Sequence, residues 1–301
     1  RGDFVICQSL TFVGSANPIL YCNAEPIFID SETETWNMCP LLLEKAINDS
    51  LKINKKPKAI ILVHLYGMPA KINEIKEISK KYDIPLIEDA AEALGSNYDG
   101  IPLGTIGDFG ILSFNGNKII TTSGGGALIS SSFEHSKKAK FLSSQAKENT
   151  IHYQHKEIGY NYRISNVLAA IGLGQIEQID KKIKIRRKNF SLYKKYLNNI
   201  EEISFLEEPL NFYSNRWITT ILVSSQNGFC KEKIIRNLRE NKIESRPIWK
   251  PMHLQPLYKQ YKFYNNNSSE KLFNLGLCLP SGTTLTEEQI SKISQIIISS
   301  K

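Results

Sequence analysis

The sequence predicts an α/β fold in which a mostly parallel sheet is flanked by helices and followed by a smaller α+β domain. Up to about residue 135, strand-like and helix-like segments alternate, which favours parallel strands joined by helical crossovers. Residues 58–64 contain five apolar residues in succession, as in a strand that is buried on both faces. Later in the chain the pattern becomes mixed. We therefore expect a large domain over residues 1–180 and a small C-terminal domain over residues 181–301.

The first half of the chain supplies the predicted sheet and the helices around it. Its strands are expected at residues 4–7, 24–30, 58–64, 85–89, 109–114 and 127–129. Residues 12–21 have helical spacing, and Pro40 stands where the first turn of a helix tolerates proline. Another helix is marked by Ile72, Ile75 and Ile78, which recur at helical spacing.

The second half combines helices and strands in a less regular order. A helical pattern runs through residues 165–196, with Ser165 as a candidate N-cap. Residues 217–223 predict a strand and residues 234–238 a helix. We expect Thr286 to cap a last helix that reaches residue 298. The polar stretch 265–269 is rich in turn-forming residues and predicts a surface loop.

Composition argues against several classes of protein. The chain has 301 residues, 41% of them hydrophobic, and a net charge of +8. Its basic residues are scattered, whereas nucleic-acid binding calls for a dense basic stripe or a recognisable module. We therefore expect no nucleic-acid partner. A mild positive field suits an anionic small molecule.

Cysteine usage and hydropathy bear on metal binding and on location. The five cysteines include no C-x-x-C pair, so neither a disulfide framework nor a zinc site is expected. No apolar run approaches the length of a membrane span, so no membrane partner is expected either. These features favour a cytoplasmic location without a bound metal.

Polar residues follow three of the predicted strands at the point where each strand ends. They are His64, Asp89 and Ser113. Because ligands of parallel α/β sheets bind beyond the carboxyl ends of the strands, these residues indicate a cofactor site. His64 is equally compatible with a buried, inert position.

Residues 113–128, S-F-N-G-N-K-I-I-T-T-S-G-G-G-A-L, contain the strongest local signal. Lys118 follows a strand and lies among small polar residues, ahead of three glycines. A lysine amine forms a Schiff base with an aldehyde cofactor, and hydroxyl groups and backbone amides nearby bind phosphate. The alternative is a solvent-exposed lysine in a glycine turn.

Asp89 ends the predicted strand at residues 85–89. Pyridoxal 5′-phosphate (PLP) needs an anion beside its pyridine nitrogen, which keeps that nitrogen protonated and the ring able to accept electrons. An aspartate at this place can also simply cap the next helix. Asp89 and Lys118 are separated by enough chain for one crossover and one strand, so both can reach the same edge of the sheet.

Several segments together resemble the DegT/DnrJ/EryC1/StrS sugar aminotransferases, which are fold-type-I PLP enzymes. E-D-A-A-E-A-L-G-S, S-F-N-G-N-K and G-G-G carry the resemblance first. Further segments extend it over nearly the whole chain: S-L-T-F-V-G-S-A-N at 9–17, V-H-L-Y-G-M-P-A at 63–70, G-Y-N-Y-R-I-S-N at 159–166 and R-P-I-W-K-P-M-H-L-Q-P at 246–256.

The resemblance implies a role for each residue around the cofactor. Lys118 would form the Schiff base and move the proton during transamination, while Asp89 would pair with the pyridine nitrogen. Glu92 would lie near the phenolic oxygen and Ser113 at the phosphate. Phe12 would stack on the cofactor ring, although an aromatic residue there can also fill the core.

The resemblance also implies residues for the partner subunit and for the substrate. Asn161 and Arg163 match a loop that reaches into the active site of the other subunit, so a homodimer with shared active sites is expected. The same segment can simply start a helix at Ser165, and both interpretations can hold. Trp249 and His253 match a segment that approaches the sugar, although a lone histidine is more often structural.

Within the family, S-F-N-G-N-K-I-I-T-T together with W-K-P-M-H-L-Q resembles the bacillosamine, legionaminic acid and perosamine branch. It implies amination of the 4-keto group of a 4-keto-6-deoxy sugar nucleotide, with L-glutamate as amino donor. We favour a UDP-linked N-acetylated sugar over GDP-linked or dTDP-linked ones.

Three other functions are weighed against transamination. A PLP-dependent sugar dehydratase of the same family would have histidine in place of Lys118. A non-enzymatic PLP-binding regulator could keep the lysine. A nicotinamide enzyme would need G-x-G-x-x-G after the first strand, where Q-S-L-T-F-V-G stands instead.

The beginning of the sequence resembles the interior of a longer chain. Arg1, Gly2 and Asp3 stand directly before an apolar run, like the turn before an internal strand. The family's Ser-Gly-Thr turn, which binds the cofactor phosphate, is expected to precede Arg1. We therefore expect an N-terminally truncated piece that binds PLP poorly by itself.

Overall fold

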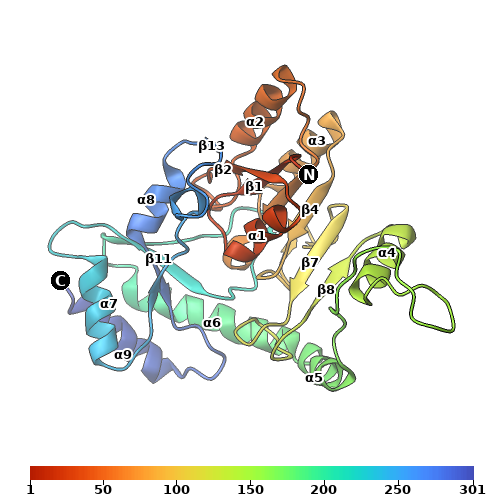
Figure 1. Cartoon of the computed structure of the whole chain (residues 1–301). Helices are drawn as coiled ribbons and strands as arrows, with labels where there is room; N and C mark the ends of the chain where they lie inside the picture. Colours follow the sequence, from red (N-terminus) through yellow and green to blue (C-terminus); the bar gives the residue numbers. More distant parts are fainter.

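A seven-stranded sheet forms the centre of the computed structural model, which describes all 301 residues (Figure 1). The strand order is β13-β2-β1-β3-β4-β7-β8, and only the pairing of β7 with β8 is antiparallel. The predicted α/β class with a mostly parallel sheet is therefore confirmed. The strands are β1 (Phe4–Gln8), β2 (Glu25–Ile29), β3 (Ala59–Val63), β4 (Leu86–Asp89), β7 (Phe109–Ser113), β8 (Gly126–Ile129) and β13 (Phe263–Tyr264).

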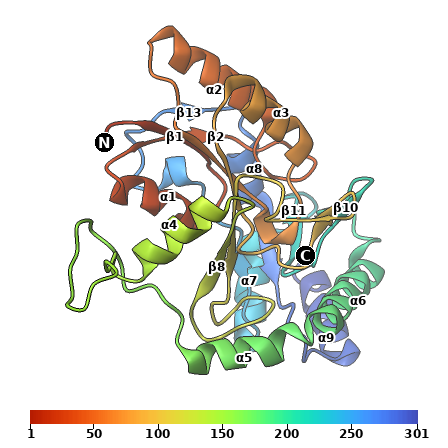
Figure 2. The same cartoon turned by 90° about the vertical axis from the view of Figure 1, so that its right-hand side faces the viewer.

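Helices cover both faces of this sheet, as the apolar patterns predicted (Figure 2). On one face, α2 (Pro40–Lys52) and α3 (Ile72–Tyr82) bury their aliphatic residues against β1 to β4. On the other face, α1 (Val13–Tyr21) packs Ala16 and Ile19 against β1 and β2. Pro40 occupies the first turn of its helix, where a missing N–H costs no hydrogen bond.

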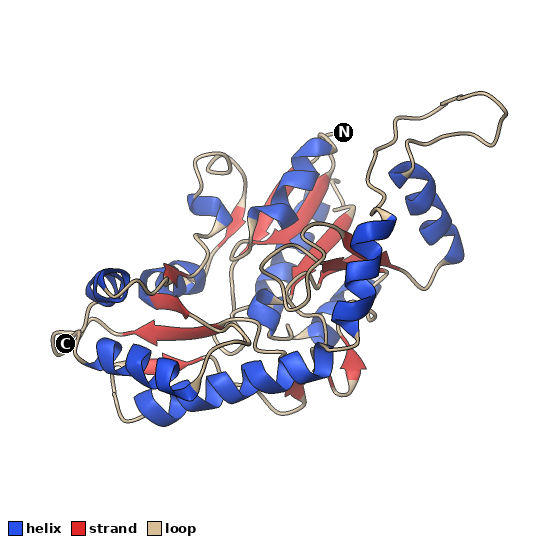
Figure 3. Cartoon of the chain, turned by 90° about the horizontal axis from the view of Figure 1, so that it is seen from below, coloured by secondary structure: helices blue, strands red, loops and turns tan.

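The C-terminal part has its own four-stranded antiparallel sheet, in the order β12-β14-β11-β9. Three helices share one hydrophobic core with it, and Thr286 caps the last of them through a capping box with Gln289. Figure 3 shows this smaller sheet and its helices to one side of the large sheet. The elements are β9 (Ile203–Phe205), β11 (Thr219–Val223), β12 (Arg246–Pro247), β14 (Gly276–Leu279), α6 (Ile179–Leu197), α7 (Lys231–Glu240) and α9 (Glu287–Ile298).

The two parts of the chain are more interwoven than the sequence predicted. Strand β13 joins the edge of the large sheet, beside β2. A third, small sheet pairs β5 (Asn97–Tyr98) with β6 (Ile101–Pro102) and with β10 (Phe212–Tyr213). Strands β10 and β13, which lie after residue 181, thus pair with strands that lie before residue 180. A single domain boundary between residues 180 and 181 stays a prediction.

The prediction of a surface loop at residues 265–269 is wrong for the last two of these residues. Ser268 begins helix α8 (Ser268–Leu275), and both Ser268 and Ser269 are buried. The cause is Asp30, a buried aspartate after β2, whose carboxylate accepts the backbone N–H groups of both serines at 3.2 and 2.9 Å. It satisfies N–H groups that a helix start leaves open.

The helical pattern of residues 165–196 forms two helices, α5 (Asn166–Ile176) and α6, and the Ser165 hydroxyl caps α5 by accepting the Leu168 N–H. Helix α4 (Phe133–Ser143) and the loop after it project from the rest of the chain (Figures 1 and 3). Neither α4 nor α5 has a buried residue. Among the helices, none combines the length and the apolar character needed to span a membrane.

Candidate active site

A cavity of about 300 Å³ lies where β1, β3, β4 and β7 end. It corresponds to the edge of the sheet at which the sequence predicted a cofactor, and two tryptophans of the C-terminal part close it. Its lining is Thr11, Phe12, Gly14, Val63, Asp89, Ala91, Glu92, Ile111, Ser113, Asn115, Asn117, Lys118, Trp217 and Trp249.

Lys118 points into this cavity and is nearly buried, with 12% of its side chain exposed. The two residues after it, Ile119 and Ile120, are buried and hold its backbone in place. Its Nζ lies 4.2 Å from the centroid of the Trp217 ring and 3.7 Å from Oε1 of Glu92. The lysine is therefore held inside the site, and the alternative of a solvent-exposed lysine does not apply.

Asp89 ends β4 and lines the same cavity. Its Oδ2 accepts a hydrogen bond of 2.6 Å from the Ser15 hydroxyl, and its Oδ1 accepts the Ala91 N–H at 3.1 Å. Each carboxylate oxygen can accept more than one hydrogen bond, so both keep capacity for a donor in the cavity. A neighbouring Thr11 hydroxyl bonds Ser15 at 2.8 Å and extends this support.

Glu92 lies beside Lys118 in the turn after β4 and is almost completely buried. Its Oε2 accepts the backbone N–H of Tyr66 at 2.6 Å. Burial, assisted by the charge of Asp89, raises the pKa of Glu92 to about 7, against the lowering effects of Lys118 and the Tyr66 N–H. This carboxyl can therefore hold a proton near neutral pH.

The remaining residues predicted around the cofactor also line the cavity. The Phe12 ring is 53% exposed at the mouth, and its centroid lies 5.5 Å from that of Trp249. Ser113 stands at the end of β7, where its hydroxyl accepts the Asn115 N–H at 3.4 Å. The Trp249 indole N–H is buried at the cavity wall, near enough to the Glu92 carboxyl to lower its pKa.

The structure places His253 outside the cavity lining. Its Nδ1 bonds the Ser9 hydroxyl at 2.7 Å, and its Nε2 lies 3.2 Å from Oε1 of Glu270. The ring stacks on Phe263 with 3.6 Å between centroids, and burial lowers the pKa of His253. Both ring nitrogens are thus engaged within the fold, and a direct contact with the sugar stays a prediction.

Asn161 and Arg163 also lie away from this cavity, in the loop between α4 and α5. Both are exposed, and Asn161 Oδ1 accepts a hydrogen bond of 2.6 Å from Gln145. Because they stand on the projecting part of the chain, they do not contact the cavity of their own subunit. Their predicted role in the site of a partner subunit stays a prediction.

His64 and the glycines after Lys118 have structural positions. His64 is fully buried between Glu88 Oε2, at 3.0 Å, and the Ala70 N–H. Gly126 is required because a Cβ there would lie 2.4 Å from the Leu112 carbonyl oxygen. None of these groups lines the cavity.

Sequence reasoning missed three residues that hold the site together. Asn215 is fully buried, and its Nδ2 donates to the carbonyl oxygens of Glu92 and Leu94 at 2.9 and 3.0 Å. Its Oδ1 accepts the Trp217 N–H at 2.8 Å, which fixes the ring above Lys118. The third is Tyr66, whose hydroxyl accepts the backbone N–H of Trp249 at 2.8 Å.

Only one of these three had a signal in the sequence, since Tyr66 belongs to the V-H-L-Y-G segment. The glycine after it is part of the same arrangement. Gly67 has φ +83°, and a Cβ there would lie 2.0 Å from Asn215 Oδ1. Asn215 and Trp217 lie in N-R-W, which carries no recognisable motif.

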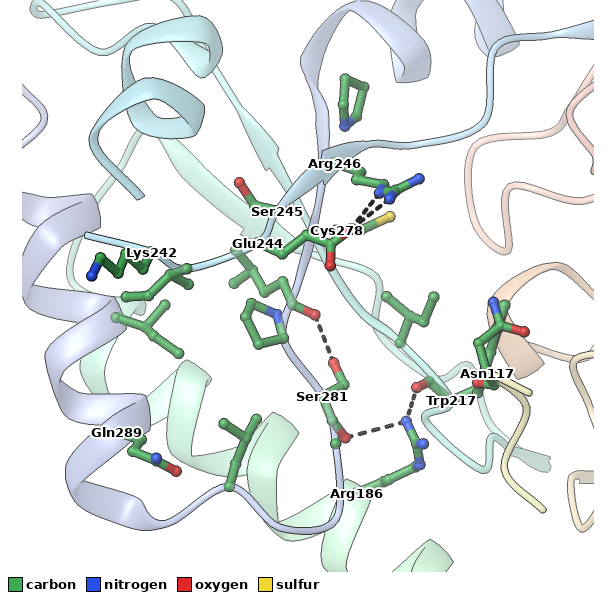
Figure 4. Close-up of a pocket in the computed structure, with 18 of the residues that line it drawn as sticks. Asn117, Arg186, Trp217, Lys242, Glu244, Ser245, Arg246, Cys278, Ser281 and Gln289 are labelled. Atoms are coloured by element: carbon green, nitrogen blue, oxygen red, sulfur yellow. Dashed lines mark hydrogen bonds and ion pairs between the residues drawn. The ribbon is translucent and has the colours of Figure 1, made fainter. Parts of the chain in front are cut away.

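A larger cavity of about 800 Å³ adjoins the first and shares Asn117, Trp217 and Trp249 with it (Figure 4). Most of its charged lining residues are basic: Arg186, Lys242, Arg246 and Lys292 stand against one acidic residue, Glu244. Arg186 donates to the carbonyl oxygens of Trp217 and Ser281, its Nε is buried without a partner, and burial lowers its pKa to about 10. The approach to the Lys118 cavity is therefore positively charged.

The residues of the smaller cavity fit PLP. They present an amine, a carboxylate with free acceptor capacity and an aromatic face, all on one space of about 300 Å³. That volume lies at the lower end of the range for ligand pockets. Lys118 and Asp89 would hold the cofactor ring between them, and Phe12 would cover it.

Comparisons with known proteins agree with this chemistry. A curated protein of Bacillus subtilis, "Putative pyridoxal phosphate-dependent aminotransferase EpsN", is 48% identical over 99% of this chain and 77% of its own length. GDP-perosamine synthase of Escherichia coli O157:H7 is 38% identical over 99% of this chain and 79% of its length. A solved DegT DnrJ EryC1 StrS aminotransferase from Brucella abortus has a TM-score of 0.91 at 29% identity, covering 99% of this chain and 79% of that one.

The family itself is identified over almost the whole sequence. Residues 1–298 match the model of the DegT/DnrJ/EryC1/StrS aminotransferase family. The predicted enzyme class and cofactor are thereby confirmed, together with the fold-type-I architecture. The chain belongs to the DegT/DnrJ/EryC1/StrS family of PLP-dependent aminotransferases.

Proposed function

We propose that the protein transfers the amino group of L-glutamate to the 4-keto group of a 4-keto-6-deoxy sugar nucleotide. The observation that carries this proposal is the meeting of Lys118 and Asp89 across one cavity. When bound, PLP stores the amino group between the two half-reactions and accepts electrons into its ring. The residues of this chain supply binding, orientation and proton transfer.

Each lining residue has a task that follows from its position. Lys118 places a mobile amine at the reacting carbon, where it takes and returns the proton. The Asp89 carboxylate, held by Ser15, keeps a proton on the ring nitrogen. Phe12 excludes water from one face of the ring at the cavity mouth, and Ser113 donates its hydroxyl to the phosphate.

For the sugar, the sequence segments favour a UDP-linked N-acetylated substrate. A curated relative supports it: UDP-4-amino-4,6-dideoxy-N-acetyl-beta-L-altrosamine transaminase of Campylobacter jejuni is 33% identical over 86% of this chain. A GDP-linked sugar is the second candidate because the E. coli GDP-perosamine synthase is more similar. The basic lining next to the Lys118 cavity supports an anionic substrate of either kind.

The proposal is tested by incubating the PLP-loaded protein with glutamate and a panel of UDP-, GDP- and dTDP-linked 4-keto-6-deoxy sugars. We expect 2-oxoglutarate and a 4-amino sugar nucleotide, with the highest kcat/KM for the UDP-linked N-acetylated member. Glutamate alone should remove the visible absorbance of the bound cofactor, which a PLP-binding regulator would leave unchanged. No amino sugar from any member would refute the proposal, and loss of oxygen from the sugar without amination would indicate a dehydratase.

We also propose a homodimer in which each subunit completes the site of the other. Its support is the loop after α4 together with helix α5, which expose large hydrophobic side chains that water does not favour. They are Ile151, Tyr153, Ile158, Tyr162, Val167 and Leu173. Asn161 and Arg163 stand among them, outside their own cavity.

A complementation experiment tests the shared site. Lys118→Ala and Arg163→Ala subunits are each expected to be nearly inactive as homodimers. In a mixed dimer one site has both native residues, so about a quarter of the wild-type activity should return after subunit exchange. A mixture that stays as inactive as its components, although light scattering shows dimers exchanging, contradicts the shared site.

A further inference from the structure

The amine of Lys118 lies between one aromatic face and one carboxyl group. On one side, Trp217 presents its ring to Nζ at 4.2 Å. On the other side, Glu92 Oε1 is 3.7 Å away, and Glu92 is the one carboxylate that pairs with this lysine. Asp89 shares the cavity but directs its oxygens at Ser15 and Ala91.

The Glu92 carboxyl is oriented by the fold toward Lys118. Its Oε2 is held by the Tyr66 N–H at 2.6 Å, which leaves Oε1 as the oxygen nearest to Nζ. The peptide of Glu92 is fixed as well, because Asn215 donates to its carbonyl oxygen. Only 5% of the Glu92 side chain is exposed, so bulk water does not compete for this oxygen.

We propose that Glu92 is the acid–base partner of Lys118. A proton passes from Nζ of the Lys118 ammonium to Oε1 of Glu92, which breaks an N–H bond and forms an O–H bond. The products are a neutral amine and a neutral carboxylic acid, so the pair needs no further reactant. The neutral amine is the form that attacks the aldehyde of a cofactor, and the proton returns by the same path. This inference rests on the proposed function only in taking Lys118 as the cofactor lysine.

The electrostatics of the pocket suit such an exchange. Burial first, and then Asp89, raise the pKa of Glu92 to about 7, near the pH at which the exchange must run in both directions. The other titratable groups that face Glu92 are Tyr66 and Cys278. Burial raises the pKa of Tyr66 well above its ordinary value and that of Cys278 to about 12, so both remain neutral.

The separation of 3.7 Å closes by a small movement of the flexible lysine stem. Catalytic hydrogen bonds are commonly longer in cofactor-free sites and shorten once the site is filled. The Trp217 face lies on the opposite side of the amine and can stabilise an ammonium group by cation–π attraction.

The first test measures the proton on Glu92 directly, in the cofactor-free protein. Infrared difference spectra across a pH titration should show a carboxylic-acid band that disappears around neutral pH. Glu92→Gln should lack this band, whereas Glu77→Gln, a matched change on the exposed side of α3, should keep it. A wild-type protein without a carboxylic acid near neutral pH overturns the proposal, even if the variants fail to fold.

The second test measures proton transfer through the rate at which the cofactor-free protein captures PLP, followed by visible absorbance. The wild type should show a titration around neutral pH in this rate. Glu92→Gln keeps an oxygen for the Tyr66 N–H but cannot accept the proton, so capture should be about 10²-fold slower and lack that titration. Capture by Glu92→Gln at the wild-type rate and with the wild-type pH profile overturns the proposal.

These outcomes separate the inference from the proposed function. If Lys118 does not capture PLP in the wild type even at saturating PLP, the proposed function fails. If capture proceeds and the sugar is aminated while Glu92→Gln behaves like the wild type, only the role of Glu92 fails. Circular dichroism of Glu92→Gln and of Glu77→Gln confirms that the measurements compare folded proteins.

Discussion

Glu88 and Glu92 are two buried glutamates at the end of the same strand, and their surroundings differ. Glu88 accepts four hydrogen bonds, from His64 and from the backbone N–H groups of Gly104, Ile106 and Gly107. Burial alone would raise the pKa of Glu88, but these donors bring it below its ordinary value. Glu92 accepts one N–H and has its pKa raised to about 7.

The difference shows how hydrogen-bond donors offset the effect of burial on the pKa of a buried carboxyl. A carboxylate with enough donors stays charged and inert, and the Glu88 network closes the fold behind the sheet end. A carboxyl with few donors, next to a cavity and a lysine, can exchange a proton. Asp89 lies between the two in sequence and faces the cavity with acceptor capacity left.

The largest effect on activity is expected for Lys118→Ala, at the cavity that Glu92 lines and Glu88 does not. The variant loses both the covalent link to the cofactor and the amine that moves the proton, so transamination should fall by at least about 10³-fold. The measurement is 2-oxoglutarate formation under saturating substrate. Turnover within a few-fold of the wild type would mean that another residue carries the chemistry.

Asp89→Asn should have the next largest effect. The amide keeps the shape of the side chain and its contact with Ser15 but removes the charge that holds a proton on the ring nitrogen. A loss of about 10²-fold in kcat is expected, with KM little changed. A loss confined to KM would place Asp89 in substrate binding instead.

The pH dependence of the stability of the cofactor-free protein distinguishes Glu88 from Glu92. The pKa of Glu88 is lowered on folding, so its contribution is present above the unfolded pKa and is lost as the pH falls. Glu88→Gln should therefore cost about 3 kcal/mol at neutral pH and progressively less in acid. Urea unfolding midpoints measure this.

The raised pKa of Glu92 has the opposite sign. Between the ordinary pKa of 4.5 and about 7, the folded state binds more protons than the unfolded state, so wild-type stability falls as pH rises through this window. Relative to the wild type, Glu92→Gln should gain up to about 3 kcal/mol across it. Parallel pH trends for Glu88→Gln and Glu92→Gln would break the contrast between the two glutamates.

The smallest effect is expected for Tyr66→Phe. The variant keeps the aromatic ring and the backbone N–H that binds Glu92, and loses only the hydroxyl that accepts the backbone N–H of Trp249. Stability should fall by about 1 kcal/mol, with kcat within a few-fold of the wild type. A loss of activity as large as that of Asp89→Asn would show that the hydroxyl takes part in the chemistry.

Local patterns made much of this molecule predictable. The apolar run of β3, the proline that opens α2 and the acid at the end of β4 are each read from a few neighbouring residues. Parallel strands then bring Asp89 and Lys118 to the same edge of the sheet. The family segments point to Glu92, Ser113 and Phe12, which all line the cavity.

What escaped prediction depends on contacts between distant parts of the chain. Strand β13 has two residues and no readable periodicity, and it exists because β2 offers an open edge. Trp217 donates its indole N–H to the Asn117 carbonyl oxygen, one hundred positions away in the sequence. The pKa of Glu92 depends on how few donors the fold brings to it, which sequence spacing does not reveal.

The central claim is that Lys118 bonds the cofactor in the cavity that Asp89 shares. Borohydride reduction of the PLP-loaded protein, followed by peptide mass spectrometry, tests it most directly, because reduction makes that bond permanent. We predict a pyridoxyl group on Lys118, absent from Lys118→Ala. A pyridoxyl group on a different lysine of the active protein would contradict it.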